Sequence, residues 1–128
     1  MVVRVVRLGT RRHPREGLRI GTVRRPPRGV SKSKHASGDW YDVWLPNLAP
    51  SAATIRAFTA ARSDAAWKQL ARTYRAEMAK PESRALLEVL AALSRTTNFS
   101  VGCYCEDETR CHRSLLRALL VEHGAKVA

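Results

Sequence analysis

Short runs of apolar and β-branched residues near both ends of the chain predict β-strands. Residues 2–8 (Val-Val-Arg-Val-Val-Arg-Leu) form the first run, and residues 18–23 form the second. Residues 99–105, which follow a long helical middle section, predict a buried strand. Residues 125–127 would begin a last strand where the chain ends.

The middle of the chain repeats its apolar residues with the period of an α-helix. Four helices are predicted, over about 51–60, 63–78, 81–93 and 112–123. The second of them has its apolar residues at spacings of 0, 3, 4, 7 and 11, which places them on one face: Trp67, Leu70, Ala71, Tyr74 and Met78. We expect these side chains to belong to the core. Gly124 follows the last helix, where glycine commonly ends a helix.

The order of these elements predicts an α/β fold. The strand at 99–105, the helix at 112–123 and the strand at 125–127 form a βαβ unit, whose two strands pair in parallel. A chain of 128 residues fits one domain with one hydrophobic core. We therefore predict a single α/β domain over residues 1–128, a three-layer-like fold with a small, mostly parallel sheet and about four helices.

One long loop interrupts this pattern. Residues 24–39 contain two prolines, two glycines, three serines and five basic residues, so they predict neither helix nor strand. Long loops inside small domains are usually functional or disordered. The prolines stiffen the segment, and its arginines would project in set directions toward an anionic ligand or lie on a solvated surface. The aromatic residues Trp40, Tyr41 and Trp44 follow, and we expect them to pack on the core, with base stacking as the alternative.

The distribution of charge points to anionic partners. The net charge is +12, and residues 1–34 alone carry 11 Lys/Arg against one acid, Glu16. Such an imbalance attracts nucleic acid or phosphorylated ligands. An ordinary solubilising surface is the other interpretation of the same charges.

Two further features suggest a cellular compartment. No apolar run is long enough to span a bilayer, and the first residues do not resemble a signal peptide. The odd number of three cysteines, packed within nine residues, is not a disulfide framework. We expect a cytoplasmic protein with reduced thiols and no membrane contact.

The segment that carries chemistry runs from Phe99 to Ser114. A strand delivers Cys103, and a short polar loop then delivers Cys111-His112-Arg113-Ser114 at the start of a helix. The free N–H groups of a helix N-terminus favour an anion. Arg113 would add a forked donor and Ser114 a hydroxyl, while the same surroundings would lower the pKa of the Cys111 thiol. Cys103, Cys111 and His112 are therefore the candidate catalytic residues.

The spacing of the residues tests several more specific interpretations of this segment. A tyrosine-phosphatase loop needs an arginine six residues after the cysteine, but Thr109 follows Cys103 at that distance and Cys111 follows Cys105. A sulfurtransferase loop is disfavoured by the acids at 106–108, which would raise the pKa of Cys105. The pattern C-x-C-x5-C-H has the right ligand types for zinc but not a familiar spacing. We therefore predict no metal ligand, leave the cofactor unknown and keep zinc as an alternative.

The chain also resembles the domain-of-unknown-function 488 family from about residue 4 to residue 125. The resemblance implies a compact α/β domain and brings no established activity. Val23, Pro26 and Cys105 stand where a better-known branch has Asp, Trp and Glu, so roles that depend on those residues do not transfer. The resemblance rests on these elements of the sequence: Arg19, Arg24, Pro27-Arg28-Gly29-Val30-Ser31-Lys32, Leu48-Ala49-Pro50-Ser51, Cys103 and Cys111-His112-Arg113-Ser-Leu-Leu.

Motifs at both ends of a small chain predict that the two ends meet. We expect the loop from Arg24 to Lys34 to fold over the mouth formed by Cys103 and Cys111-His112-Arg113, which would make one pocket. The candidate anion-binding residues share a charged or hydroxyl side chain in these motifs: Arg19, Arg24, Arg28, Arg113 and Ser114.

Three functions fit such a pocket. The first is an enzyme on a phosphorylated or nucleotide-like substrate, with His112 as acid and base and Cys111 or Cys103 as nucleophile. The second is a nucleic-acid or nucleotide binding module without chemistry. In the third, the Cys-His-Arg turn has a structural role only and connects the last strand to the last helix through buried hydrogen bonds. The partner is accordingly an anionic small molecule or a nucleic acid, and the pattern sets no oligomeric state.

Overall fold

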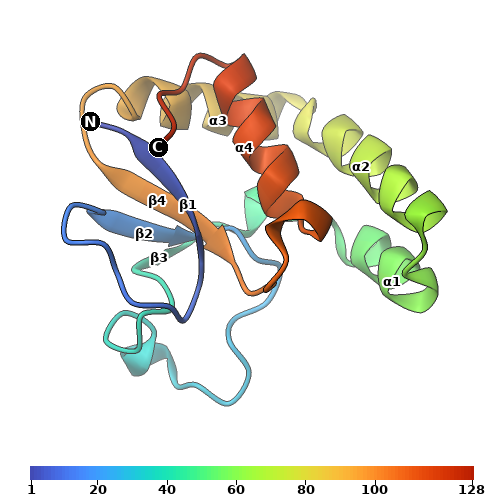
Figure 1. Cartoon of the computed structure of the whole chain (residues 1–128), viewed down its shortest axis with the longest axis horizontal. Helices are drawn as coiled ribbons and strands as arrows, with labels where there is room; N and C mark the ends of the chain where they lie inside the picture. Colours follow the sequence, from blue (N-terminus) through green and yellow to red (C-terminus); the bar gives the residue numbers. More distant parts are fainter.

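The computed structural model describes all residues 1–128, and its centre is a four-stranded parallel sheet (Figure 1). The strands are β1 (Val3–Arg7), β2 (Leu18–Gly21), β3 (Val43–Trp44) and β4 (Phe99–Cys103), in the spatial order β1-β4-β2-β3. All of the pairs are parallel. The central position of β4 explains why all five of its residues are buried.

Four helices accompany the sheet: α1 (Ala52–Ala61), α2 (Asp64–Met78), α3 (Pro81–Leu93) and α4 (His112–Glu122). Their bounds lie within about two residues of the predicted ones because the local signals are strong. Ser51 and Ser63 cap α1 and α2 by accepting hydrogen bonds from backbone N–H groups three residues later. Gly124 follows α4 with a φ of +91°, a conformation that glycine adopts without strain. The predicted single-domain α/β fold is confirmed.

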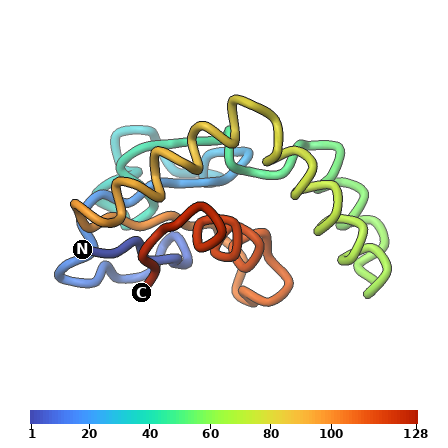
Figure 2. The backbone as a smooth tube through the Cα atoms, turned by 90° about the horizontal axis from the view of Figure 1, so that it is seen from above, coloured from blue at the N-terminus to red at the C-terminus, as the bar shows by residue number.

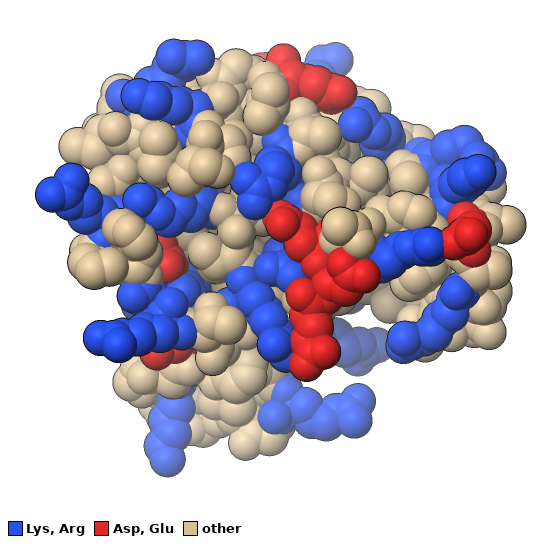
Figure 3. Space-filling model, in the orientation of Figure 1, with Lys and Arg blue, Asp and Glu red and all other residues tan.

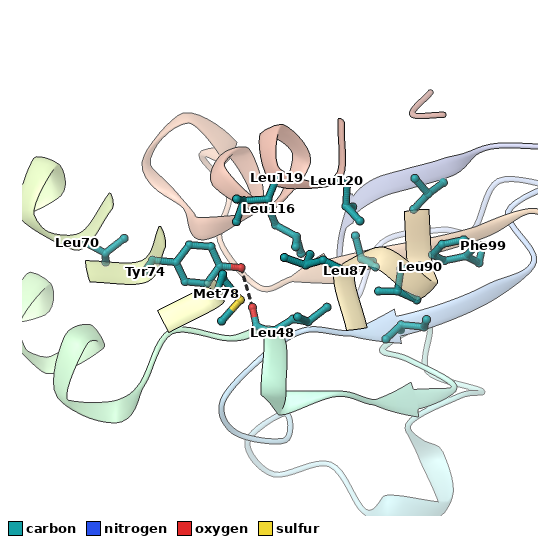
Figure 4. Close-up of a cluster of buried hydrophobic side chains, with 13 residues drawn as sticks. Leu48, Leu70, Tyr74, Met78, Leu87, Leu90, Phe99, Leu116, Leu119 and Leu120 are labelled. Carbon is teal, nitrogen blue, oxygen red and sulfur yellow. Dashed lines mark hydrogen bonds between the residues drawn. The ribbon is translucent and has the colours of Figure 1, made fainter. Parts of the chain in front are cut away.

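One face of the sheet carries the apolar core. Phe99 and Val101 of β4 point to this face with Ile20 of β2, and side chains from α2, α3 and α4 cover them. Figure 4 shows this cluster, in which the buried hydroxyl of Tyr74 donates a 2.8 Å hydrogen bond to the carbonyl oxygen of Leu48. That bond satisfies the one polar group that the ring brings into the core.

Loops cover the opposite face, where a buried ion pair lies beside a smaller apolar cluster that includes Leu8 and Tyr41. Arg19 and Glu16 are 0% and 1% exposed, and the Arg19 Nε lies 2.6 Å from Oε2 of Glu16. Ser100 donates to the same carboxylate, and Arg19 Nη1 donates to the carbonyl oxygens of Thr10 and Asp39. The arginine thus ties the loops to the sheet. The third layer of the fold therefore consists of loops, and the helices share one face.

Two elements differ from the sequence prediction. The expected strand at 125–127 contributes a single bridge, in which Val127 pairs in parallel with Val3 at the outer edge of β1. The aromatic segment after Trp40 contributes the two-residue strand β3, which pairs with β2. Both are edge elements, and short edge strands carry a weak pattern of apolar residues.

The fold leaves a space beside the carboxyl ends of the central strands. The helices α1 and α2 pack against each other, with the rings of Phe58 and Trp67 5.9 Å apart, and extend beyond the strands (Figures 1 and 2). The chain that leaves β2 and the loop that leaves β4 both reach this region, next to the start of α4. Ligands in open parallel sheets bind at this end of the strands. No helix combines the length and the apolar character that a membrane crossing requires.

The buried ion pair makes one prediction about stability. Glu16→Gln should lower the free energy of unfolding by about 3–5 kcal/mol, because it leaves the buried Arg19 guanidinium without a counter-charge. Urea denaturation followed by circular dichroism measures the change. In the control Glu122→Gln, which removes the exposed partner of Arg75, the loss should be at most about 1 kcal/mol. Equal losses in the two variants would contradict the structural role of the pair.

The same carboxylate predicts how stability depends on pH. Burial alone would raise the pKa of Glu16, but hydrogen bonds from Arg19 and Ser100 outweigh it and lower the pKa to about 2. The folded pKa of Glu16 is thus lower than its unfolded pKa of about 4.3. The contribution of the ion pair to the free energy of unfolding is therefore complete above about pH 4.3 and is lost as the pH falls toward 2. Acid titrations of the unfolding free energy should therefore fall less steeply in Glu16→Gln than in the wild type over this range, and identical slopes would contradict the assignment.

Candidate functional site

The space beside the strand ends is a hollow of about 910 Å³. Its walls come from α1, from the chain after β2 and from the β4–α4 loop, and its inner surface is largely apolar, with Val23, Ile55, Phe58 and Leu70 among its residues. Figure 3 shows acidic side chains gathered along the β4–α4 loop, with basic side chains on both sides of them. The hollow therefore combines an apolar interior with a charged rim.

Three groups with metal-binding and catalytic chemistry meet at one wall of the hollow. Cys103 is the last residue of β4, Cys111 immediately precedes α4, and His112 is the first residue of that helix. The two sulfurs and a ring nitrogen of His112 all lie within 4.8 Å of one another, and Cys111 Sγ is 3.8 Å from Nδ1. The fold thus brings together the three residues predicted as catalytic. The same three could hold a metal ion.

The tautomer of His112 follows from its hydrogen bonds. Its Nε2 lies 2.7 Å from the carbonyl oxygen of Thr22, which can only accept, so Nε2 carries the proton. Burial lowers the pKa of His112 and favours the neutral ring. Nδ1 is therefore unprotonated and directs its lone pair toward Cys111. The ring of Tyr74 packs against the imidazole at a centroid distance of 5.6 Å and holds its orientation.

A third thiol joins this cluster. The neighbouring thiols of Cys103 and Cys111 lower the pKa of Cys105. The other two thiols, together with burial, raise the pKa of Cys103. Although the neighbouring Cys103 thiol lowers it, the Cys105 thiol and burial raise the pKa of Cys111 to about 11, which contradicts the lowered pKa expected from the sequence. Sequence reasoning had assigned Cys105 no role, and the acids that follow it had suggested a raised pKa.

Of the five predicted anion-binding residues only Arg24 lines the hollow, and Arg113 and Ser114 are two of the four that do not. Arg113 is 4% exposed, donates from Nη2 to the carbonyl oxygen of Cys105 and leaves its Nε without a partner. Ser114 donates its hydroxyl to the carbonyl oxygen of Cys111 at 2.9 Å. Both side chains stabilise the turn between β4 and α4, and neither belongs to the lining of the hollow.

The basic segment reaches the hollow with its first arginines only. Arg24 lines the hollow and donates to the carbonyl oxygens of Pro50 and Ala49, which fixes the segment to the start of α1. Arg28 lies instead in a neighbouring hollow of about 630 Å³. Arg19, buried in its ion pair with Glu16, lies away from both hollows. Residues 26–34 thus do not close over the thiols as the sequence had suggested.

Sequence reasoning missed three arginines that line the hollow. Arg25, Arg56 and Arg62 line it and form no ion pair or hydrogen bond through their side chains. A fourth arginine, Arg110, is bound to Asp64 across the gap between the β4–α4 loop and the start of α2. Arg25 could have been found as the neighbour of Arg24. Arg56 on α1 and Arg62 immediately after it carry no local signal, because their relevance depends on where that helix lies.

The exposure of the three thiols predicts the order in which they react. Iodoacetamide added to the reduced native protein should modify Cys105 first, because Cys105 is exposed whereas Cys103 and Cys111 are each 2% exposed. Peptide mass spectrometry over a time course measures the order. In the urea-unfolded protein, which serves as the control, the three rates should converge. Modification of Cys103 before Cys105 in the native state would contradict this geometry.

Comparison with known proteins places the chain in a family. A family model described as the active DUF488-N3 subclade matches residues 3–124. Searches of curated proteins and of solved structures found no match. The match covers nearly the whole chain and confirms the resemblance predicted from the two motifs. The protein is therefore a member of the DUF488-N3 subclade of the domain-of-unknown-function 488 family.

Proposed function

We propose that this protein is an enzyme that binds a phosphorylated or nucleotide-like substrate in the 910 Å³ hollow. The observation that carries the proposal is the position of arginines without acid partners in the same hollow as the thiol–imidazole cluster. Arg25, Arg56 and Arg62 would hold the anion, because guanidinium groups bind phosphate oxygens in pairs. The matched family model is described as an active subclade, which agrees with catalysis.

The geometry assigns roles to the reacting groups. Cys111 would attack the electrophilic atom of the substrate, and its thiol proton would pass to Nδ1 of His112, 3.8 Å from the sulfur. The departing oxygen would take that proton from His112 as its bond to the electrophilic atom breaks. A water molecule would then attack the group bound to the Cys111 sulfur with Nδ1 as base, and the released sulfur would take the proton back from His112. The Thr22 carbonyl keeps Nε2 protonated throughout and so leaves Nδ1 as the basic atom.

The apolar interior contributes to this proposal as well. Side chains such as Ile55 and Phe58 exclude water from part of the hollow and leave room for the uncharged part of a substrate. Exclusion of water also strengthens the attraction between the arginines and an anion. A substrate with a phosphate and an apolar or aromatic group fits both features.

A binding module for nucleotides or nucleic acid is the second candidate, and the neighbouring hollow favours it. Arg25 and Tyr104 line both hollows, and Arg28 and Trp40 line the second one. The Tyr104 hydroxyl donates a 2.8 Å hydrogen bond to the carbonyl oxygen of Arg25, which fixes the wall between them. Arginines next to aromatic rings are typical of surfaces that bind phosphates and stack bases.

Anion binding is tested by titration calorimetry with pyrophosphate and with nucleoside mono- and triphosphates. The double variant Arg25→Ala/Arg62→Ala should lose at least about tenfold in affinity, because each charge-assisted hydrogen bond contributes about 1.5 kcal/mol or more. The charge-matched control is Arg11→Ala/Arg84→Ala, which removes two exposed arginines outside both hollows and should bind as the wild type does. Absence of binding by the wild type, or equal losses in both double variants, would contradict the proposal.

Turnover then separates the enzyme from the binding module. Wild-type protein incubated with the ligands that it binds should release a product detectable by phosphate assay or chromatography. Cys111→Ser should bind the same ligands and lose this release. Tight binding without any turnover by the wild type would favour the binding module.

A further inference from the structure

The thiol–imidazole cluster has a second property that anion binding does not require. Cys103, Cys111 and His112 present three ligand atoms within 4.8 Å of one another at the wall of the hollow. Sulfur and imidazole nitrogen are the ligands that zinc prefers in proteins. We propose that these three residues bind one zinc ion, whose fourth coordination position faces the hollow.

The separations between the ligand atoms fit this ion. Bonds of about 2.3 Å to sulfur and about 2.0–2.1 Å to nitrogen in a tetrahedral site place neighbouring ligand atoms roughly 3.5–3.8 Å apart. The Cys111 sulfur and Nδ1 of His112 are 3.8 Å apart, so this pair is already spaced for zinc. The other separations are at most 4.8 Å, so zinc binding requires the longest of them to shorten by about 1 Å.

The surroundings of His112 match those of a metal ligand. A ligating histidine usually donates its other ring N–H to a carbonyl or carboxylate, which fixes the tautomer and the orientation of the ring. Nε2 of His112 donates to the carbonyl oxygen of Thr22 at 2.7 Å, and this leaves Nδ1 free on the side of Cys111. The remaining ligand, Cys103, ends a strand that is buried along its whole length. The three ligands are therefore held by rigid elements.

Charge also favours an ion with an open position. Binding of Zn²⁺ releases the protons of Cys103 and Cys111, so that two thiolates and a neutral imidazole leave the centre without net charge. The guanidinium of Arg113 is buried next to this cluster, and its Nε has no hydrogen-bond partner. An anionic group at the fourth position would balance it, and the arginines of the hollow would bring such a group there.

The inference goes beyond the proposed function, because the arginines bind an anion with or without zinc. In the zinc-bound protein the sulfur of Cys111 would be a ligand and would no longer act as the nucleophile, so the metal site replaces that role and leaves the arginines unchanged. Cys105, which is exposed and does not belong to the group of three, is not required as a ligand.

Cobalt is the probe that tests this site, since Co²⁺ substitutes for zinc and absorbs light. Reduced, chelator-treated full-length protein titrated with CoCl₂ should bind one equivalent. It should develop the visible bands of tetrahedral cobalt and a near-ultraviolet thiolate-to-cobalt charge-transfer band, and one equivalent of ZnCl₂ should abolish both. A wild-type protein without these bands overturns the proposal, and this result depends on no variant.

Variants identify the ligands. Cys111→Ser and His112→Gln should lose stoichiometric cobalt binding, with circular dichroism confirming that they are folded. Cys105→Ser and His13→Gln should keep one equivalent and the charge-transfer band. Loss of binding in Cys105→Ser would overturn the open three-residue site. The pyrophosphate titration of chelator-treated wild type reports separately on the proposed function, so the two proposals can fail independently.

Discussion

The hydrogen bond between Nε2 of His112 and the carbonyl oxygen of Thr22 joins two segments that are 90 residues apart in the chain. It forms because β2 and β4 are neighbouring parallel strands, with Gly21 opposite Gly102, so that both chains leave the sheet at the same edge. The bond fixes the tautomer of the imidazole and thereby the atom that faces Cys111. The arrangement of the thiols, the proposed acid–base chemistry and the proposed metal site all depend on this contact.

The proposed binding of an anion in the hollow depends on how the nearby acids are paired. Asp64 is bound to Arg110, and Glu106 lies 3.5 Å from Arg7, so these carboxylates are paired at the rim. The arginines of α1 and of the segment after β2 have no such partners. A positive field therefore remains where the apolar interior raises the strength of charge interactions. By contrast, the most deeply buried arginine of the sheet, Arg19, forms an ion pair with Glu16 and binds the loops to the sheet.

Strong local signals made much of the fold predictable. The helices have a clear apolar period, and two of them have capping serines. Strand β1 is rich in β-branched residues and β4 is a short run of buried residues, so these elements could be predicted from the sequence. The site could be predicted from the sequence only in part. That Cys103, Cys111 and His112 would meet followed from a strand–loop–helix pattern within a few residues. Whether Arg19 or Arg25 faces the hollow depends on how the loops pack, and no local pattern reports that.

The central claim is that arginines and the thiol–imidazole cluster share one binding space. It is tested most directly by a crystal structure of the protein soaked with tungstate, a heavy mimic of phosphate that anomalous scattering locates without ambiguity. The account predicts a tungstate ion in the hollow, in contact with Arg25 or Arg62 and on the side of Cys111. Tungstate bound only elsewhere on the basic surface, with the hollow empty at saturating concentration, would contradict it.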